Sequence, residues 1–178
     1  IIGLPLPGVS IRLADEANIK LADTSEPGEI QVKGPNVFKE YWRKPEATTT
    51  SFTTDGWFKT GDIAEVEHGY YKILGRNSVD IIKSGGYKIS ALEIEEVLRS
   101  HPAVSDCAVV GLPDEEWGET VAAAIVGDAS LDTEELTPWL KARMPGYRVP
   151  RKCLSLSELP RNAMGKVTKN DVKKLFNT

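Results

Sequence analysis

An aspartate directly after a glycine stands at the predicted start of a strand, within residues 55–62 (DGWFKTGD). A carboxylate at this position, Asp62, can present both oxygens outward and accept one O–H from each hydroxyl of a vicinal diol such as ribose. The simpler interpretation is a turn aspartate that bonds its own backbone. The nearby aromatic pair and the preceding Thr60-Gly61 favour the diol-binding interpretation.

A second group of candidate residues lies in residues 75–95 (GRNSVDIIKSGGYKISALEIE). Arg76 offers a planar fork of donors that suits phosphate or ribose oxygens. Gly85 and Gly86 have no Cβ, so a ligand can approach their backbone closely. Taken alone, the segment is also explained by a glycine-rich hairpin that carries a surface arginine.

A lysine follows a glycine in the third group, residues 159–168 (LPRNAMGKVT). This segment is not a Walker A loop, because Pro160 stands where the first glycine is required and Thr168 comes one place late. A lysine on such a loop, here Lys166, can still stabilise developing negative charge when a closed site surrounds it. The alternative is a solvated loop lysine without a chemical role.

The composition limits the classes of protein that the chain can belong to. Its 178 residues make one large domain or two small ones, with enough length to bury a core. Two cysteines and two histidines cannot build a disulfide framework or a histidine-rich metal centre. No apolar run approaches the ~18–20 residues of a transmembrane helix. The chain begins at Ile1, so we expect a piece of a longer protein.

The charge is unevenly distributed along the chain. From Lys141 to the end there are ten basic residues and two acidic ones, although the net charge is −4. A basic end on an acidic body indicates an anionic ligand near the C-terminus, or simply a solvated lysine-rich face. Nucleic acid is a poorer explanation, because the basic stretch lacks interleaved aromatic residues and the isoelectric point is near 5.3.

The first 75 residues predict short strands separated by turns. Residues 9–13 and 29–33 alternate between apolar and polar side chains. Residues 63–67 and 70–74 predict a hairpin, with His68-Gly69 where a tight turn requires positive φ. No helix of convincing length is indicated, so we expect a small, distorted β-barrel or a sandwich.

The remaining residues alternate between strand and helix signals. Ser90 and Glu93 form a capping box that opens a helix, and Asp132 predicts a second helix unless Pro138 moves its start. Strands are expected at 79–83, 104–112, 120–126 and 152–156, with a last helix after Thr168. The fold class is therefore α+β: a small all-β subdomain, then a compact α+β domain, with a boundary near residues 75–78.

Together the motifs resemble the adenylate-forming superfamily, which includes acyl-CoA synthetases, peptide-synthetase adenylation domains and luciferases. The resemblance covers nearly all of residues 1–178. It is carried by Thr60-Gly61-Asp62, Gly75-Arg76, Gly85-Gly86-Tyr87-Lys88 with Glu93-Ile94-Glu95, and Pro160-Arg161-Asn162 with Gly165-Lys166. Within the superfamily, residues 55–62 and 76–95 most resemble the mitochondrial malonyl-CoA and methylmalonyl-CoA synthetases, also called acyl-CoA synthetase family member three.

The resemblance implies a reaction in two steps, with ATP and coenzyme A as substrates. A carboxylate attacks the α-phosphate of ATP, and the thiol of coenzyme A then displaces AMP. By this analogy Asp62 holds the ribose hydroxyls, Arg76 contacts the same nucleotide, and Lys166 bridges the α-phosphate and the carboxylate. Lys83, Gly85 and Gly86 would line the pantetheine tunnel, and Lys88 would contact the coenzyme A phosphates.

The resemblance also implies a domain organisation and a location. Residues 1–76 would end the large AMP-binding domain, and residues 77–178 would be the mobile C-terminal domain. One residue is inserted relative to most members, so the pivot is Ser78, Val79 or Asp80.

The missing N-terminal domain would carry the phosphate loop, the acyl pocket and the ligands for Mg²⁺. The fragment alone would therefore be inactive, and the parent protein would be mitochondrial.

Three alternatives stay open: another fatty acyl-CoA synthetase, an adenylation domain that loads a carrier protein, and a truncated, non-catalytic nucleotide-binding module.

Overall fold

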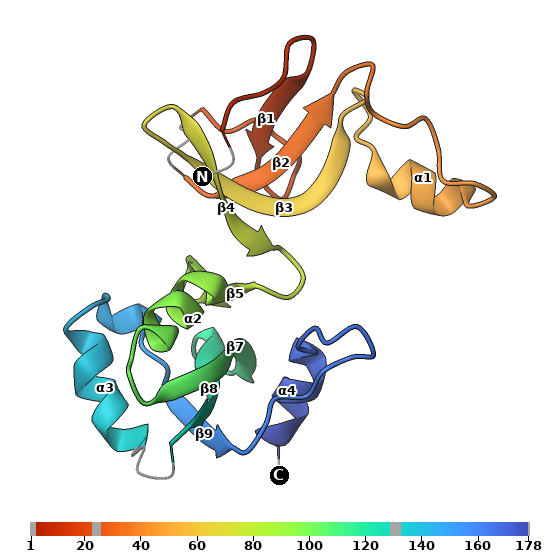
Figure 1. Cartoon of the computed structure of the whole chain (residues 1–178). Helices are drawn as coiled ribbons and strands as arrows, with labels where there is room; N and C mark the ends of the chain where they lie inside the picture. The colour runs from red at the N-terminus through yellow and green to blue at the C-terminus, as the bar shows by residue number, and fades with distance from the viewer. Residues whose placement is uncertain (1–2, 23–25, 129–132, 178) are drawn as a thin grey trace. The chain divides into compact units, whose positions relative to one another are not determined.

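The computed structural model describes residues 3–22, 26–128 and 133–177 (Figure 1). The chain forms two compact units, Ile1–Ser78 and Val79–Thr178. The structural division thus lies two residues beyond the expected end at residue 76. The assignment of the units to a large and a mobile domain stays a prediction.

The first unit is built on an antiparallel sheet. Its strands are β1 (Ser10–Ala14), β2 (Gly28–Lys33), β3 (Phe58–Glu67) and β4 (Tyr70–Arg76), paired in that order. The hairpin between β3 and β4 turns at His68 and Gly69, whose φ angles are 51° and 85°. Two positive φ angles in succession suit a tight turn that follows the twist of the strands, as expected from the sequence.

The expected barrel does not close. Within the described part of the chain, β1 and β4 are the two edges of an open sheet. The physical reason is the small number of strands, since closure needs a tilt and stagger that four strands cannot provide around a filled interior. A short helix, α1 (Pro45–Ser51), lies between β2 and β3, so the unit is not purely β.

The second unit combines a mixed sheet with helices. Two short strands precede a helix, and two long strands follow it, which confirms the α+β class. The elements are β5 (Ile81–Ser84), β6 (Tyr87–Ser90), α2 (Ala91–Arg99), β7 (Val104–Asp114), β8 (Gly118–Gly127), α3 (Thr133–Lys141), the 3₁₀ helix η1 (Gly146–Arg148), β9 (Lys152–Leu156) and α4 (Lys169–Leu175). The strand order is β6-β5-β8-β7, and β9 pairs in parallel with β8.

Strands β7 and β8 are buried on both faces, which explains why they read as continuous apolar runs. Val109 and Ile125 pack on one face with residues of α2 and α3, such as Ile94. On the other face Val110 packs with Val172 of α4. The two faces therefore alternate along each strand with the period of a pleated sheet.

The sequence signals at the helix ends are partly confirmed. Ser90 is the N-cap of α2, and its Oγ accepts a hydrogen bond from the backbone N–H of Glu93 at 3.2 Å. Helix α3 contains Pro138 in its interior. Asp132, the predicted cap of α3, lies outside the described residues. None of the helices that the structure describes is long and apolar enough to cross a membrane.

Candidate functional site

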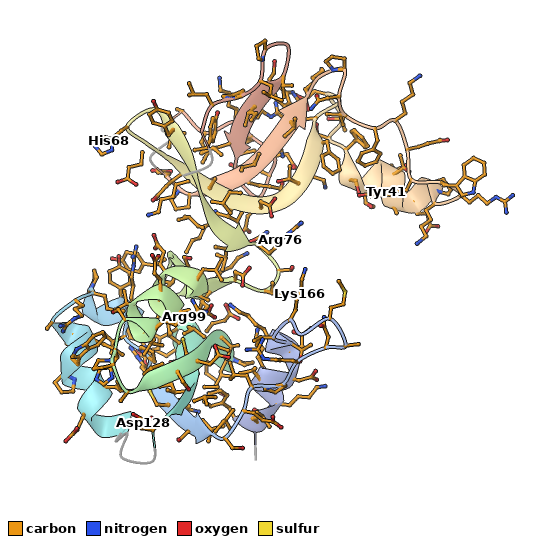
Figure 2. All side chains as sticks on the ribbon, viewed as in Figure 1. Tyr41, His68, Arg76, Arg99, Asp128 and Lys166 are labelled. Atoms are coloured by element: carbon orange, nitrogen blue, oxygen red, sulfur yellow. The ribbon has the colours of Figure 1, made fainter. Side chains whose placement is uncertain are left out.

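Asp62 and Arg76 lie directly opposite each other on β3 and β4. The Arg76 Nε is 2.9 Å from the Asp62 Oδ1, and the Arg76 Nη1 also donates to the Thr60 carbonyl oxygen at 2.8 Å. The side chains are 28% exposed for Asp62 and 59% for Arg76. The hairpin therefore presents a carboxylate and a guanidinium together at the surface of the first unit, and Figure 2 labels Arg76.

The backbone beside this pair is held by the neighbouring strand. Gly61 has a φ of +77°, and a Cβ there would lie 3.3 Å from the Arg76 Nη1. The Gly61 N–H donates to the Glu29 Oε1 at 3.1 Å, and the Thr60 hydroxyl donates to the Ile30 carbonyl at 2.8 Å. Glycine is thus needed for the conformation, and β2 sets the position of the carboxylate. Glu29 was missed by sequence reasoning because it is far away along the chain.

The expected coenzyme A residues share one hairpin of the second unit. Gly85 and Gly86 form the turn between β5 and β6, with φ angles of 56° and 83°. Lys83 and Lys88 are direct partners across the two strands, so their side chains leave the same face. The Lys83 N–H donates to the Glu119 Oε2 at 2.7 Å. The hairpin therefore places two ammonium groups beside a turn without side chains.

A pocket of about 250 Å³ lies beside this turn. The Trp117 ring forms part of its wall, and the Trp117 carbonyl accepts a hydrogen bond from the Gly85 N–H at 2.9 Å. The ring is so close that a Cβ on Gly85 would lie 2.8 Å from the Trp117 Cε3. The Tyr87 and Tyr147 rings stack with centroids 4.4 Å apart. The lining residues are Ser84, Gly85, Tyr87, Trp117, Val121, Gly146, Tyr147, Val149 and Arg151.

Sequence reasoning missed this pocket as a unit. Trp117, Tyr147 and Arg151 carry no common motif, and only the folding of the second unit brings them to Gly85. The Arg151 guanidinium lies 4.8 Å from the centre of the Trp117 ring, and the Trp117 side chain is 38% exposed. A flat aromatic wall with a cation beside it suits a flat, anionic ligand.

Lys166 lies on the loop that precedes α4 (Figure 2). The Asn162 Oδ1 accepts hydrogen bonds from the backbone N–H groups of Met164 and Lys166, each at 3.0 Å. Arg161 donates to the Gly165 carbonyl at 2.6 Å and pairs with Asp106 of β7. The loop is therefore well ordered by its own side chains. The Lys166 side chain is exposed and makes no hydrogen bond or ion pair with the described residues.

The cysteines are unsuited to nucleophilic chemistry. Burial raises the pKa of the Cys107 thiol to about 12 and also raises the pKa of Cys153. Both thiols therefore stay protonated near neutral pH. Over residues 3–22, 26–128 and 133–177, no group of three or more His, Cys, Asp or Glu side chains could hold a metal ion.

The comparisons with known proteins agree with these features. Residues 93–166 match the model of the AMP-binding enzyme C-terminal domain. A probable CoA ligase from Humulus lupulus is 49% identical over 97% of this chain and 30% of its own length. The Bos taurus protein named Malonate–CoA ligase ACSF3, mitochondrial, is 46% identical over 98% of this chain and 34% of its own length. The crystal structure of ATP-bound MatB from Rhodopseudomonas palustris matches with a TM-score of 0.83 at 40% identity, over 96% of this chain and 34% of that one.

The chain belongs to the adenylate-forming superfamily, and its second unit contains the AMP-binding enzyme C-terminal domain. Its relatives include CoA ligases and malonate–CoA ligases. The resemblance found in the sequence is thereby confirmed. The chain spans about a third of the length of these relatives.

Proposed function

We propose that the chain is the C-terminal part of an ATP-dependent acid–thiol ligase. The observation that carries this proposal is the exposed Lys166 ammonium, held without a partner among the described residues on a loop fixed by Asn162 and Arg161. A cation that projects into solvent from a fixed loop in the free protein can stabilise charge that develops on a substrate once the site closes around it. The membership of the superfamily and the CoA ligases among the relatives support a carboxylic acid, ATP and coenzyme A as the substrates.

In the first step, a carboxylate oxygen attacks the α-phosphorus of ATP and the bond to pyrophosphate breaks. Negative charge then builds on the oxygens of that phosphorus, where the Lys166 ammonium would neutralise it. Asp62 would accept hydrogen bonds from the ribose hydroxyls, and Arg76 would both orient Asp62 and bind the nucleotide. The product is an acyl-adenylate.

In the second step, the thiol of coenzyme A attacks the acyl carbonyl, and AMP leaves. Gly85 and Gly86 would let the pantetheine chain pass close to the backbone. Lys83 and Lys88, on one face of the hairpin, would attract the phosphates of coenzyme A. The pocket lined by Trp117 and the two stacked tyrosines offers an aromatic wall for the adenine ring.

Between the steps, we propose that residues 77–178 move as a mobile domain relative to residues 1–76, with the pivot at Ser78, Val79 or Asp80. Such a movement would exchange Lys166 for the glycine turn at one reaction centre. The large domain ahead of this chain would hold Mg²⁺, which would neutralise charge on the ATP phosphates.

Malonate or methylmalonate is the proposed acid, and the mitochondrion is the proposed location. The support comes from the relatives, one of which is named a mitochondrial malonate–CoA ligase. The acyl pocket itself would lie ahead of this chain.

The test is thioester formation by the full-length parent with ATP, Mg²⁺ and coenzyme A. Malonate, methylmalonate, acetate and a medium-chain fatty acid are compared. Preference for either of the first two acids is the expected result. Preference for the monocarboxylates would overturn the substrate but keep the reaction class. Transfer to a carrier protein instead of coenzyme A would overturn the acceptor, and no activity with any acid and acceptor would indicate a non-catalytic module.

A further inference from the structure

Four charged side chains meet inside the second unit. The Lys169 Nζ, at the first residue of α4, lies 2.8 Å from the Asp80 Oδ1 and 2.9 Å from the Glu95 Oε1. The Arg99 Nη2 lies 3.2 Å from the other carboxylate oxygen of Glu95. Only 11% of the Lys169 side chain and 4% of the Glu95 side chain are exposed. Two cations and two anions balance one another, so none of the buried charges is left uncompensated.

The charges connect segments that are far apart in the sequence. Asp80 immediately precedes β5, and its carbonyl oxygen accepts a hydrogen bond from the Ala91 N–H at 2.8 Å, at the start of α2. Glu95 lies on α2, and its Oε1 also accepts a hydrogen bond from the Val109 N–H of β7 at 2.8 Å. Lys169 therefore attaches the beginning of α4 to a part of the unit that is fixed by both helix and sheet.

The attached end of α4 is also the end of the loop that carries Lys166. The Thr168 N–H and hydroxyl both donate to the Pro160 carbonyl, at 2.9 and 3.3 Å, and so close the base of the loop. On the other side of the loop, Arg161 pairs with Asp106 of β7. Lys169 is adjacent to Thr168, so its ion pairs hold the closed base of the loop against the second unit.

We propose that Lys169 is a positioning residue for Lys166, an inference that rests on the function proposed above. The Lys169 ammonium fixes the base of the loop to Asp80 and Glu95, and this sets where the Lys166 ammonium stands in the adenylation step. An apolar residue at position 169 could fill the same space, but it would give no electrostatic attachment to the two carboxylates. A displacement of about 1 Å of a catalytic group can cost ~10²-fold in rate.

The kinetic test uses the full-length parent, with residues numbered as in this chain. The variant Lys169→Met combined with Glu95→Gln removes the attachment together with one charge of each sign, so the net charge of the cluster is unchanged. It retains an amide oxygen for the Val109 N–H. Asp80 is left unchanged because it belongs to the predicted pivot. Lys174→Met, which removes an exposed ion pair with Asp171 on the same helix, is the matched control.

The expected result is a selective loss. The kcat of acid-dependent pyrophosphate exchange should fall about 10- to 100-fold with little change in the KM for ATP. Thioester formation from supplied acyl-adenylate should stay within about twofold of wild type, and so should both steps in the control. Lys169→Arg keeps a cation that reaches both carboxylates, so the kcat of pyrophosphate exchange in this variant should stay within about threefold of wild type.

A second readout does not depend on activity. Hydrogen exchange at the backbone amides of residues 161–168 should be at least about tenfold faster in the double variant than in the control, whereas the amides of β7 other than that of Val109, which bonds Glu95, should be unchanged. A circular dichroism spectrum of the double variant that matches that of the wild-type protein confirms that the variant is folded. If it is not, Lys169→Arg and Lys169→Gln are compared by the same exchange measurement.

Three results for the double variant would overturn the positioning role of Lys169. They are unchanged hydrogen exchange in the loop, unchanged adenylation, and an equal loss of rate in both half-reactions. Failure of the proposed function is distinguishable from these results. If Lys166→Ala leaves adenylation intact, the proposed function is wrong. If Lys166→Ala abolishes adenylation while the Lys169 variants behave as wild type, only the positioning role is wrong.

Discussion

Asp55 shows how a single residue in the first unit depends on one partner. The Arg12 guanidinium bonds both carboxylate oxygens of Asp55, at 2.8 and 3.2 Å, and the Thr53 hydroxyl donates to the carboxylate at 2.6 Å. Arg12 also lies 4.5 Å from the centre of the Trp57 ring. The Arg12 hydrogen bonds, followed by that from Thr53, lower the pKa of Asp55 to about 2.

This pKa predicts a pH dependence of stability. Because the folded-state pKa lies below the unfolded value of 3.8, the ionised Asp55 stabilises the folded chain above about pH 4. That contribution is lost as the pH falls from about 4 to about 2. We therefore expect chain 1–178 to be more stable than its Asp55→Asn variant at pH 6, and the difference to vanish by about pH 2. Urea unfolding of both proteins at several pH values measures this difference in the free energy of unfolding.

Arg12→Gln provides the control for this prediction. In that background, Asp55→Asn should change the pH dependence much less, because the largest cause of the lowered pKa is absent and only the bond from Thr53 remains. An undiminished pH dependence without Arg12 would show that another group is responsible.

Lys166 carries the second prediction at this scale. In the full-length parent, Lys166→Ala should slow acid-dependent pyrophosphate exchange ~10²–10³-fold, since it removes a cation from charge that develops on the α-phosphate. Thioester formation from supplied acyl-adenylate should change far less. Lys152→Ala, at an exposed position on β9, is the control. Equal losses in the two half-reactions would contradict the assignment.

At the scale of elements, the two glycines of the β5–β6 hairpin allow the cost of backbone strain to be measured apart from the cost of a steric clash. Gly85 and Gly86 both have positive φ, but a Cβ on Gly85 would meet the Trp117 ring at 2.8 Å, whereas a Cβ on Gly86 meets nothing within 4 Å. Gly86→Ala should therefore cost about 1 kcal/mol in the free energy of unfolding, from strain alone. Gly85→Ala should cost about 2–4 kcal/mol, because the ring must also move.

The same pair tests the role of the hairpin. Gly85→Ala displaces the wall of the 250 Å³ pocket, so it should raise the KM for coenzyme A in the full-length parent with little effect on pyrophosphate exchange. Gly86→Ala should change that KM less. Denaturant titrations give the stabilities, and steady-state kinetics give the KM values. If both substitutions changed the free energy of unfolding and the KM for coenzyme A equally, the Trp117 ring would not restrict the side chain at position 85.

At the scale of the whole molecule, each unit has a core of its own. Leu13, Ile30 and Ala64 are buried in the first unit, and the second unit has two clusters on the opposite faces of β7 and β8. Buried cores of this kind are what allow a domain to fold alone. We therefore expect chain 1–178 to fold by itself, although it spans only about a third of the length of its relatives.

Catalysis by chain 1–178 alone is a different matter. We expect no acid-dependent release of pyrophosphate from ATP, because the chain spans about a third of its relatives' length and the acyl pocket and Mg²⁺ site are proposed to lie in the large domain ahead of it. A sensitive pyrophosphate assay on the purified chain, with the full-length parent as the positive control, makes the measurement. Release above the rate of a Lys166→Ala chain would contradict this expectation.

Signals within a few residues were sufficient to predict much of the local structure. His68-Gly69 predicted the β3–β4 turn, and Ser90 predicted the start of α2, because turn and cap preferences depend on the local backbone. The three motifs also predicted the superfamily, which the relatives confirm. The roles of Asp62, Arg76 and Lys166 in it stay predictions.

The tertiary structure decided what lies together. The sheet of the first unit stays open where a distorted barrel or a sandwich was expected, because closure depends on pairing between distant segments. The same is true of the pocket that joins Trp117, Tyr147 and Arg151, and of the buried contact between Lys169 and Glu95. The sequence by itself determined the motifs, the turns and the caps. Register and packing, which sum weak contacts over the whole chain, determined the partners of each side chain.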